Sequence, residues 1–188
     1  MNKYQKDKST NIEWIGEIPE HWELKKLKHL TYLKARVGWH GLKAEEFSLN
    51  ANLPYCITGT DFNSGVINWE TCYHVNEGRY NEDAFIQIKE NDLLVTKDGT
   101  IGKVAVVKNL KGRAILNSGV FVMRPDSNQY DTEFMYWLIQ SDAFSEFIRF
   151  TSKGSTIIHL YQDTFLNWPI GVPPLSEQTT IANYLDEK

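Results

Sequence analysis

The sequence has no long apolar run, and this absence limits where the protein can reside. No stretch approaches about eighteen consecutive apolar residues, the length from which a membrane-spanning helix is inferred. Residues 1–8 are polar and rich in lysine, and they lack the apolar segment of a secretory signal peptide. We therefore expect a cytoplasmic protein with no membrane partner.

Cysteine is scarce as well. The 188 residues include two cysteines, Cys56 and Cys72, which have neither a close partner cysteine nor the spacing of metal ligands. A disulfide framework and a zinc site are therefore not expected, and the sequence predicts no cofactor. Both thiols are expected to be free and at least half-buried.

The sequence also lacks the motifs of DNA-modifying and DNA-cleaving enzymes. Adenine methylation needs an Asn/Asp-Pro-Pro-aromatic cluster, but the one Pro-Pro pair is followed by Leu175. Metal-dependent cleavage needs acidic ligands ahead of a lysine, whereas Val95 stands two residues before Lys97. We expect a protein without catalytic residues of its own.

Charge is distributed unevenly along the chain. The net charge of −4 argues against a protein that coats DNA through phosphate neutralisation alone. Residues 1–43 carry a net charge of +4 and residues 93–124 one of +5, whereas 44–92 carry −7 and 125–188 carry −6. If the fold brings the two basic segments to one face, an acidic protein can present a local positive surface. The alternative is solvated surface charge without a partner.

The apolar pattern predicts an α+β fold with a β-rich body. Residues 50–125 contain short β-rich runs separated by turn residues, and the alternating segment 84–88 is expected to be one of the strands. From Asp131 to Phe150 apolar residues recur every three or four positions, which predicts a helix or a pair of helices in the C-terminal half.

The segments that flank this body are also predicted from local signals. For residues 23–33 a short helix and a strand are both open, and we favour the strand. Residues 165–170 are expected to form the last strand. Ser176 is then expected to cap a C-terminal helix that is cut short at Lys188.

The segment KDGTIGK at 97–103 is the most informative local motif. Two glycines in a turn between apolar strands let a ligand approach the backbone, while Lys97, Thr100 and Lys103 supply hydrogen-bond donors. The segment lacks the Gly-Lys-Ser/Thr ending of a P-loop, so binding of a nucleoside triphosphate is not expected. Taken alone, an ordinary hairpin turn is the alternative.

Four motifs occur in the order expected for the specificity subunit of type I restriction-modification enzymes. They are WIGEIP at 14–19 followed by Trp22, DGTIGKV at 98–104, GST at 154–156 followed by His159-Leu160, and PPLSEQ at 173–178. Together they cover nearly the whole chain. The sequence resembles a single target recognition domain followed by the start of a conserved spacer helix.

The resemblance implies a domain organisation and a function. It implies an N-terminal arm and clasp at 1–22, a target recognition domain at 23–172, and the start of a truncated spacer helix at 173–188. Such a domain recognises one half of a bipartite target in double-stranded DNA without catalysis of its own.

The resemblance also implies partners for this chain. Modification (methyltransferase) subunits would methylate adenine in the target, and restriction subunits would act through them. A complete subunit carries two such domains and two long helices, whereas this chain has one domain and a helix start. Self-association through the C-terminal helix is expected only if that helix is complete.

Candidate DNA contacts are polar, basic or aromatic residues in predicted loops, because such side chains bind phosphates and base edges. They are Lys34, Arg36, Trp39, His40 and Lys43 in a first cluster, Asp61, Asn63 and Ser64 in a second, Lys153, Ser155, Thr156 and His159 in a third, and Lys97, Thr100 and Lys103 in the glycine turn. The first and third clusters are expected to contact phosphate and groove, and the others to add positioning. The alternative is that several of them only cap turns.

Aromatic residues make up 13% of the sequence, which raises the question of base stacking. Trp14, Trp22, Trp137 and Trp168 have apolar neighbours and are expected in the core or the clasp. Trp39 lies beside glycines and is the exception, a candidate groove contact.

Two functions from other classes remain open. The first is a fragment of a stand-alone DNA methyltransferase or nuclease, which needs a cofactor or metal site. The second is an acidic protein-interaction module that binds a basic partner, in agreement with the net charge.

Overall fold

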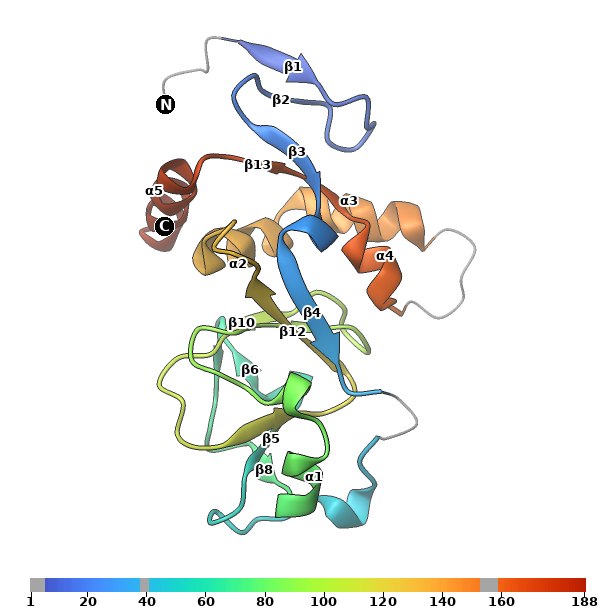
Figure 1. The fold of residues 1–188 in the computed structure, drawn as a ribbon, viewed down its shortest axis with the longest axis vertical. Helices are drawn as coiled ribbons and strands as arrows, with labels where there is room; N and C mark the ends of the chain where they lie inside the picture. The colour runs from blue at the N-terminus through green and yellow to red at the C-terminus, as the bar shows by residue number, and fades with distance from the viewer. Residues whose placement is uncertain (1–5, 38–40, 153–158) are drawn as a thin grey trace. The chain divides into compact units, whose positions relative to one another are not determined.

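The computed structural model describes residues 6–37, 41–152 and 159–188 (Figure 1). Its chain contacts define two compact units. Unit 1 consists of residues 1–31, 125–156 and 161–188, and unit 2 consists of residues 32–124 and 157–160. Unit 2 is therefore inserted into the chain of unit 1. None of the helices within the described ranges is long and apolar enough to cross a membrane.

Unit 2 is built on two sheets. The six-stranded sheet has the order β4-β12-β9-β10-β7-β6, and the three-stranded sheet has the order β11-β5-β8. The strands are β4 (Thr31–Ala35), β5 (Tyr55–Ile57), β6 (Phe62–Asn63), β7 (Val66–Ile67), β8 (Tyr73–His74), β9 (Leu93–Thr96), β10 (Val104–Val106), β11 (Ala114–Leu116) and β12 (Val120–Pro125). Strand β9 pairs antiparallel with β10 and with β12, so Val95 lies opposite Val104 on one side and Phe121 on the other. The predicted β-rich body is confirmed.

Short helical segments connect these strands. They are η3 (Ala44–Glu46), η4 (Gly59–Asp61), α1 (Glu77–Asn81) and η5 (Ala84–Ile86). The predicted strand at 84–88 is wrong, because the Asp83 side chain accepts the amide hydrogen of Phe85 at 2.8 Å and starts the 3₁₀ turn η5. The alternating apolar pattern of this segment arises because Ile86 and Ile88 are both buried.

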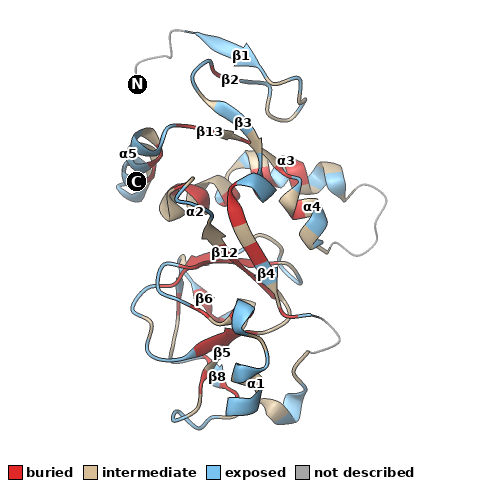
Figure 2. Ribbon diagram, viewed as in Figure 1, coloured by how far each residue is buried: buried red, intermediate tan, exposed pale blue. Residues whose placement is uncertain are grey.

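The core of unit 2 lies among these strands, and Figure 2 shows buried residues along β4, β5 and β12 while α1 is largely exposed. Both cysteines belong to it, with Cys56 fully buried and Cys72 nearly so, and both are free. Burial raises the pKa of the Cys56 thiol to about 12 and that of Cys72 still further, because a thiolate is poorly solvated there. The expectation of free, buried thiols is confirmed.

Unit 1 combines short antiparallel ladders with helices. Its elements are β1 (Asp7–Ser9), β2 (Glu17–Pro19), β3 (Glu23–Lys26), η1 (Leu27–His29), α2 (Thr132–Gln140), α3 (Asp142–Thr151), α4 (Gln162–Leu166), β13 (Pro169–Val172) and α5 (Leu175–Asp186). Strand β1 pairs with β2, and β13 pairs with β3, which places Ile170 opposite Lys25. The predicted pair of helices is confirmed by α2 and α3.

Three local predictions in unit 1 need correction. Residues 23–33 form strand, 3₁₀ turn and strand in succession, so neither single alternative describes them. Residues 165–170 are the end of α4 followed by the start of β13. The rings of Phe165 and Trp168 stack with centroids 6.1 Å apart. A helical turn brings residues three positions apart to the same side, and a single strand does not. Ser176 is not the cap: α5 begins at Leu175, and Pro174 precedes it without a side-chain capping bond.

Aromatic rings fill the core of unit 1. Trp168 is 1% exposed, and its ring centroid lies 5.1 Å from that of Phe144 and 5.7 Å from that of Phe147. Trp14 packs against Phe150 at 4.8 Å. These contacts pack rings of α3 against Trp14 and against Trp168, which follows α4, and they bury apolar surface. The assignment of Trp14 and Trp168 to packing rather than base stacking is supported.

The first and last sequence motifs meet inside unit 1. The Trp22 indole donates to Glu177 Oε1 at 3.1 Å, and His21 Nε2 lies 2.7 Å from Glu177 Oε2. The next residue, Gln178, is completely buried. Its Oε1 accepts the Asp131 amide at 2.8 Å, and its Nε2 donates to the Pro173 carbonyl at 2.9 Å. These bonds fix the start of α5.

Replacing Gln178 by Leu should destabilise unit 1. The change leaves the Asp131 amide and the Pro173 carbonyl buried without partners, a loss of about 2–4 kcal/mol for the two groups together. The midpoint of urea unfolding, followed by tryptophan fluorescence, measures it. Thr180→Ala, on the exposed side of the same helix, is the control and should leave the midpoint nearly unchanged. Equal midpoints for the two variants would contradict a structural role for Gln178.

Both cysteines should resist alkylation in the folded protein. Their burial and raised pKa leave almost no accessible thiolate at pH 8. Intact-mass analysis after iodoacetamide treatment should show no label until guanidinium unfolds the chain. An Asn52→Cys variant, which places a thiol at an exposed site, should be labelled under the same native conditions.

Candidate nucleic-acid interface

Thr96, the last residue of β9, organises the glycine turn. It is 3% exposed, and its hydroxyl donates to the Thr100 carbonyl and accepts the Lys103 amide hydrogen at 2.9 Å. The backbone adds two bonds, from Gly102 N to Thr96 O at 3.0 Å and from Thr96 N to Lys103 O at 2.9 Å. One buried hydroxyl therefore closes the turn between β9 and β10.

The same turn leaves four successive backbone donors without a partner. The amides of Asp98, Gly99, Thr100 and Ile101 donate to no group among the described residues. The first three residues are exposed and the fourth is half-buried, so solvent or a ligand can reach this stretch. Unpaired amides in an exposed turn can bind an anion.

Three further loops pack onto this turn. In η4, a Cβ on Gly59 would stand 2.6 Å from Thr96 Cγ2, and the Gly59 carbonyl accepts Lys103 Nζ at 3.0 Å. The Gly119 carbonyl accepts the Lys97 amide at 2.9 Å, and the Leu160 amide donates to the Lys97 carbonyl at 3.0 Å. We call residues 58–61, 97–103, 117–119 and 159–160 the four-loop surface. All four loops belong to unit 2.

Two lysines, the half-buried Lys97 and the exposed Lys103, and one exposed carboxylate, Asp98, lie on this surface. Lys97 Nζ lies 5.8 Å from the centre of the Phe121 ring and 3.4 Å from Asp98. His159 Nδ1 also pairs with Asp98. Asp98 is thus engaged by two basic partners, whereas Lys103 donates to a neutral carbonyl, so no carboxylate among its partners in the described part of the chain offsets its positive charge.

The structure brings together four of the predicted contact residues. Lys97, Thr100, Lys103 and His159 all lie on the four-loop surface, although His159 stands more than fifty positions from the others in the sequence. Asn63 and Ser64 are exposed at the tip of the β6–β7 hairpin, where a positive φ at Ser64 and Gly65 forms a two-residue turn. No hydrogen bond among the described residues joins that tip to the four-loop surface.

Two predicted contact residues are buried and serve the fold instead. Arg36 is 3% exposed, and it donates to the Leu116 carbonyl and to Glu82 at 3.0 Å each. Asp61 is also 3% exposed, and its carboxylate accepts the Thr58 amide at 2.8 Å. Neither side chain can reach a DNA backbone, so both predictions are corrected: Asp61 caps η4, as the turn-capping alternative proposed.

The remaining predicted residues lie apart from this surface or outside the described ranges. Lys34 is exposed on β4, with its Nζ 6.0 Å from the centre of the Phe85 ring. Lys43 is exposed before η3, where hydrogen bonds from Arg79 lower the pKa of Glu46 to about 2. Five predicted contacts fall outside the described residues: Trp39, His40, Lys153, Ser155 and Thr156.

Two contributors to this surface were not predicted from the sequence. They are the Thr96 hydroxyl, on a residue predicted only as part of a strand, and the loop Asn117-Ser118-Gly119. The last of these carried a signal, since an Asn-Ser-Gly triplet between two apolar runs is typical of a tight loop. Asn117 now accepts the Ser118 amide at 2.8 Å and donates its own amide to Ile57 at 2.9 Å.

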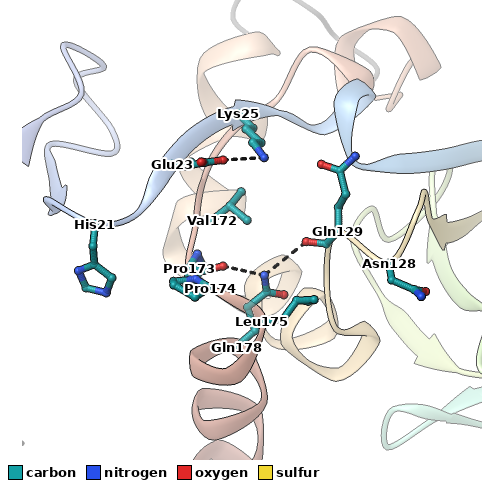
Figure 3. Close-up of a pocket in the computed structure, with 10 residues that line it drawn as sticks. All are labelled: His21, Glu23, Lys25, Asn128, Gln129, Val172, Pro173, Pro174, Leu175 and Gln178. Carbon is teal, nitrogen blue, oxygen red and sulfur yellow. Dashed lines mark hydrogen bonds and ion pairs between the residues drawn. The ribbon is translucent and has the colours of Figure 1, made fainter.

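Unit 1 contains a separate pocket of about 440 Å³ (Figure 3). Its walls come from β3, from residues 128–129, and from the Pro173-Pro174 turn with the start of α5. Gln178 lies in this pocket with its amide already bonded to Pro173 and Gln129, as the dashed lines show. Within the described ranges, no group of three His, Cys, Asp or Glu side chains could hold a metal ion.

The structure defines a mixed α+β protein in which a β-rich unit is inserted into the chain of a second unit. Residues 19–187 match the family model described as type I restriction modification DNA specificity domain, and the chain belongs to this family. Among curated relatives, it is 28% identical over 184 residues to the type I restriction enzyme MjaVIII specificity subunit of Methanocaldococcus jannaschii, and 28% identical over 177 residues to the MjaIX specificity subunit of that organism. These matches cover 95% and 91% of this chain.

The chain spans only 42% and 38% of the length of these two relatives. A solved structure, that of the HsdS subunit from Thermoanaerobacter tengcongensis, superposes with a TM-score of 0.67 at 17% sequence identity. The alignment covers 90% of this chain and 38% of that one. This similarity confirms the α+β fold.

Replacing Thr96 by Val should loosen the turn. The change removes the hydroxyl but keeps the volume, so the Lys103 amide and the Thr100 carbonyl lose a partner at a cost of about 1–3 kcal/mol. Amide hydrogen exchange at Gly102 and Lys103 should accelerate, and the urea midpoint should fall. Thr60→Val, on the exposed part of η4, is the matched control. Unchanged exchange in the Thr96 variant would show that the hydroxyl does not hold the turn.

Proposed function

We propose that this chain recognises one half of a bipartite sequence in double-stranded DNA, as the non-catalytic specificity component of a type I restriction-modification complex. The family match supports the function. The observation that carries the proposal to particular residues is the four-loop surface, where distant basic and polar residues converge on an otherwise acidic chain.

Different loops of this surface have different roles in the proposed binding. Lys97 and Lys103 supply charge for phosphate groups, and such contacts position a protein on DNA without selecting sequence. Asn117 and Ser118 are half-buried at the edge of the turn, and the Asn117 side-chain amide has hydrogens with no bonding partner among the described groups. An Asn side chain suits the N6 and N7 atoms of adenine, so Asn117 is our candidate for a base contact.

Other residues extend this surface in the proposal. Asn63 and Ser64 at the β6–β7 tip, and Lys34 and Lys43 around η3 and β4, are exposed and chemically suited to DNA. Trp39, His40, Lys153, Ser155 and Thr156 complete the proposed contact set.

The partners follow from the same proposal. The relatives are specificity subunits more than twice as long as this chain. By analogy, this chain would associate with modification subunits and, through these, with restriction subunits. The site of action would be the cytoplasm. Self-association would use α5 together with a continuation of that helix.

Two measurements separate this proposal from its rivals. A methyltransferase fragment would bind S-adenosylmethionine in a calorimetric titration, whereas a specificity domain would release no heat. A protein-interaction module would leave duplex DNA unprotected in a footprint made with the modification subunits. A specificity domain would protect a defined segment.

Selection from a library of random duplexes tests sequence recognition directly. Repeated capture by the chain, assembled with modification subunits, should enrich one short motif. Asn117→Ala should relax the preference at one position of that motif, because a good bidentate contact discriminates by about 1–3 kcal/mol. Bound and input libraries of equal composition would contradict sequence-specific recognition.

The salt dependence of DNA binding tests the two lysines. Lys97→Ala and Lys103→Ala should each weaken binding to a non-specific duplex and lower the slope of log affinity against log salt by about 1. Fluorescence anisotropy at several KCl concentrations gives both quantities. Lys111→Ala removes an exposed lysine of the same unit outside the four-loop surface and is the control. Wild-type slopes in both test variants would exclude phosphate contacts by these lysines.

A further inference from the structure

The backbone of the glycine turn has the conformation of an anion-binding loop. Within 97–103 only Gly99 and Gly102 have a positive φ, +70° and +80°. A left-handed residue between right-handed or extended neighbours turns successive amides toward one side, and such a concave row of N–H groups binds anions. The four unpaired amides, Asp98–Ile101, include the first of these glycines.

The turn is fixed before any ligand arrives. Thr96 engages the Thr100 carbonyl and the Lys103 amide from inside the protein, and the Lys97 backbone is bonded on both sides, to Gly119 and to Leu160. Two carbonyls of the turn, those of Lys97 and Thr100, are occupied by protein donors, whereas no described residue accepts the amides of Asp98–Ile101. A preorganised site loses little conformational entropy on binding.

The turn is open at its centre. A Cβ placed on Gly99 would have no atom within 4 Å, and Gly99 itself is exposed. A bulky anion can therefore approach the backbone closely at this residue. At Gly59, in contrast, the backbone is covered, because a Cβ there would stand 2.6 Å from Thr96 Cγ2.

The charges around the turn favour an anion. Lys97 and Lys103 flank it at both ends. The one carboxylate within it, Asp98, is engaged by Lys97 at 3.4 Å and by His159. Asp98 is thus neutralised by its neighbours, and Lys103, bonded to a neutral carbonyl, keeps its full charge available.

We infer that this turn is a phosphate-binding site, in which the amides of Asp98–Ile101 hold one phosphodiester group of the DNA backbone while Lys103 lies beside it. This assignment rests on the proposed function and adds to it the ligand group and the donor atoms. Backbone amides contact phosphate without regard to sequence, so the site fixes the register of the protein on DNA and leaves base selection to neighbouring side chains.

Nuclear magnetic resonance of the ¹⁵N-labelled chain tests the inference. The amide proton signals of Asp98–Ile101 should move downfield on titration with a short duplex, and also with inorganic phosphate, but not with chloride at equal ionic strength. Anisotropy of the labelled duplex reports binding independently. If the duplex binds while these signals stay in place, the phosphate site is overturned and DNA recognition stands. If phosphate moves them but no duplex binds, the anion site stands and the proposed function fails. If neither probe moves them, the inference is wrong.

Two substitutions of Gly99 provide a matched pair without a charge change. Asn tolerates a positive φ and should preserve the turn, whereas Val does not and should distort it. Gly99→Val should weaken duplex binding about tenfold, as expected when charge-assisted hydrogen bonds are lost. Gly99→Asn, which keeps the turn but places a side chain beside the anion, should weaken it less. Unchanged signals of the β-sheet residues verify the fold of both variants. Equal affinities for the two would contradict a role of the turn backbone.

Discussion

The hydroxyl of Thr96 is the constraint on which the candidate interface depends. It links the two ends of the glycine turn. The loops that carry Gly59, Gly119 and Leu160 then pack against this turn. The hydroxyl is buried at the end of β9, whose residues are packed on both faces of the sheet. The buried strand thereby restricts the conformation of the exposed loop. A recognition surface needs loops that are held in place by a rigid scaffold.

The proposed binding of a polyanion is compatible with the acidic composition of the chain. Net charge describes the whole chain, whereas binding depends on the local field. Many acidic side chains of unit 2 are paired internally, for example Glu77 with Arg113 and Asp92 with Arg124. In the glycine turn, Lys97 is paired with Asp98, whereas Lys103 donates to the neutral Gly59 carbonyl. The local charge of the surface therefore depends on which side chains are paired as well as on composition.

The sequence predicted the strands and the α2–α3 pair well, because apolar periodicity reflects which face is buried. It failed where a single local hydrogen bond decides the conformation, as at Asp83, or where aromatic stacking does, as at Phe165 and Trp168. For the site, residue type identified Lys97 and Lys103 but could not separate them from the buried Arg36, whose carbonyl partner lies eighty positions away. A hydrogen bond between residues so far apart in the sequence cannot be predicted from the residues next to either partner.

The bond between Trp22 and Glu177 has a consequence for how the chain folds during synthesis. Its two partners are 155 residues apart in the sequence, so this contact within unit 1 forms only after residue 177 has left the ribosome. Residues 32–124 of unit 2 are continuous, and they emerge much earlier. His159 is the exception, since it joins the four-loop surface from the late part of the chain. A nascent chain therefore completes the four-loop surface only after residue 160 has left the ribosome, well after residues 32–124 have emerged.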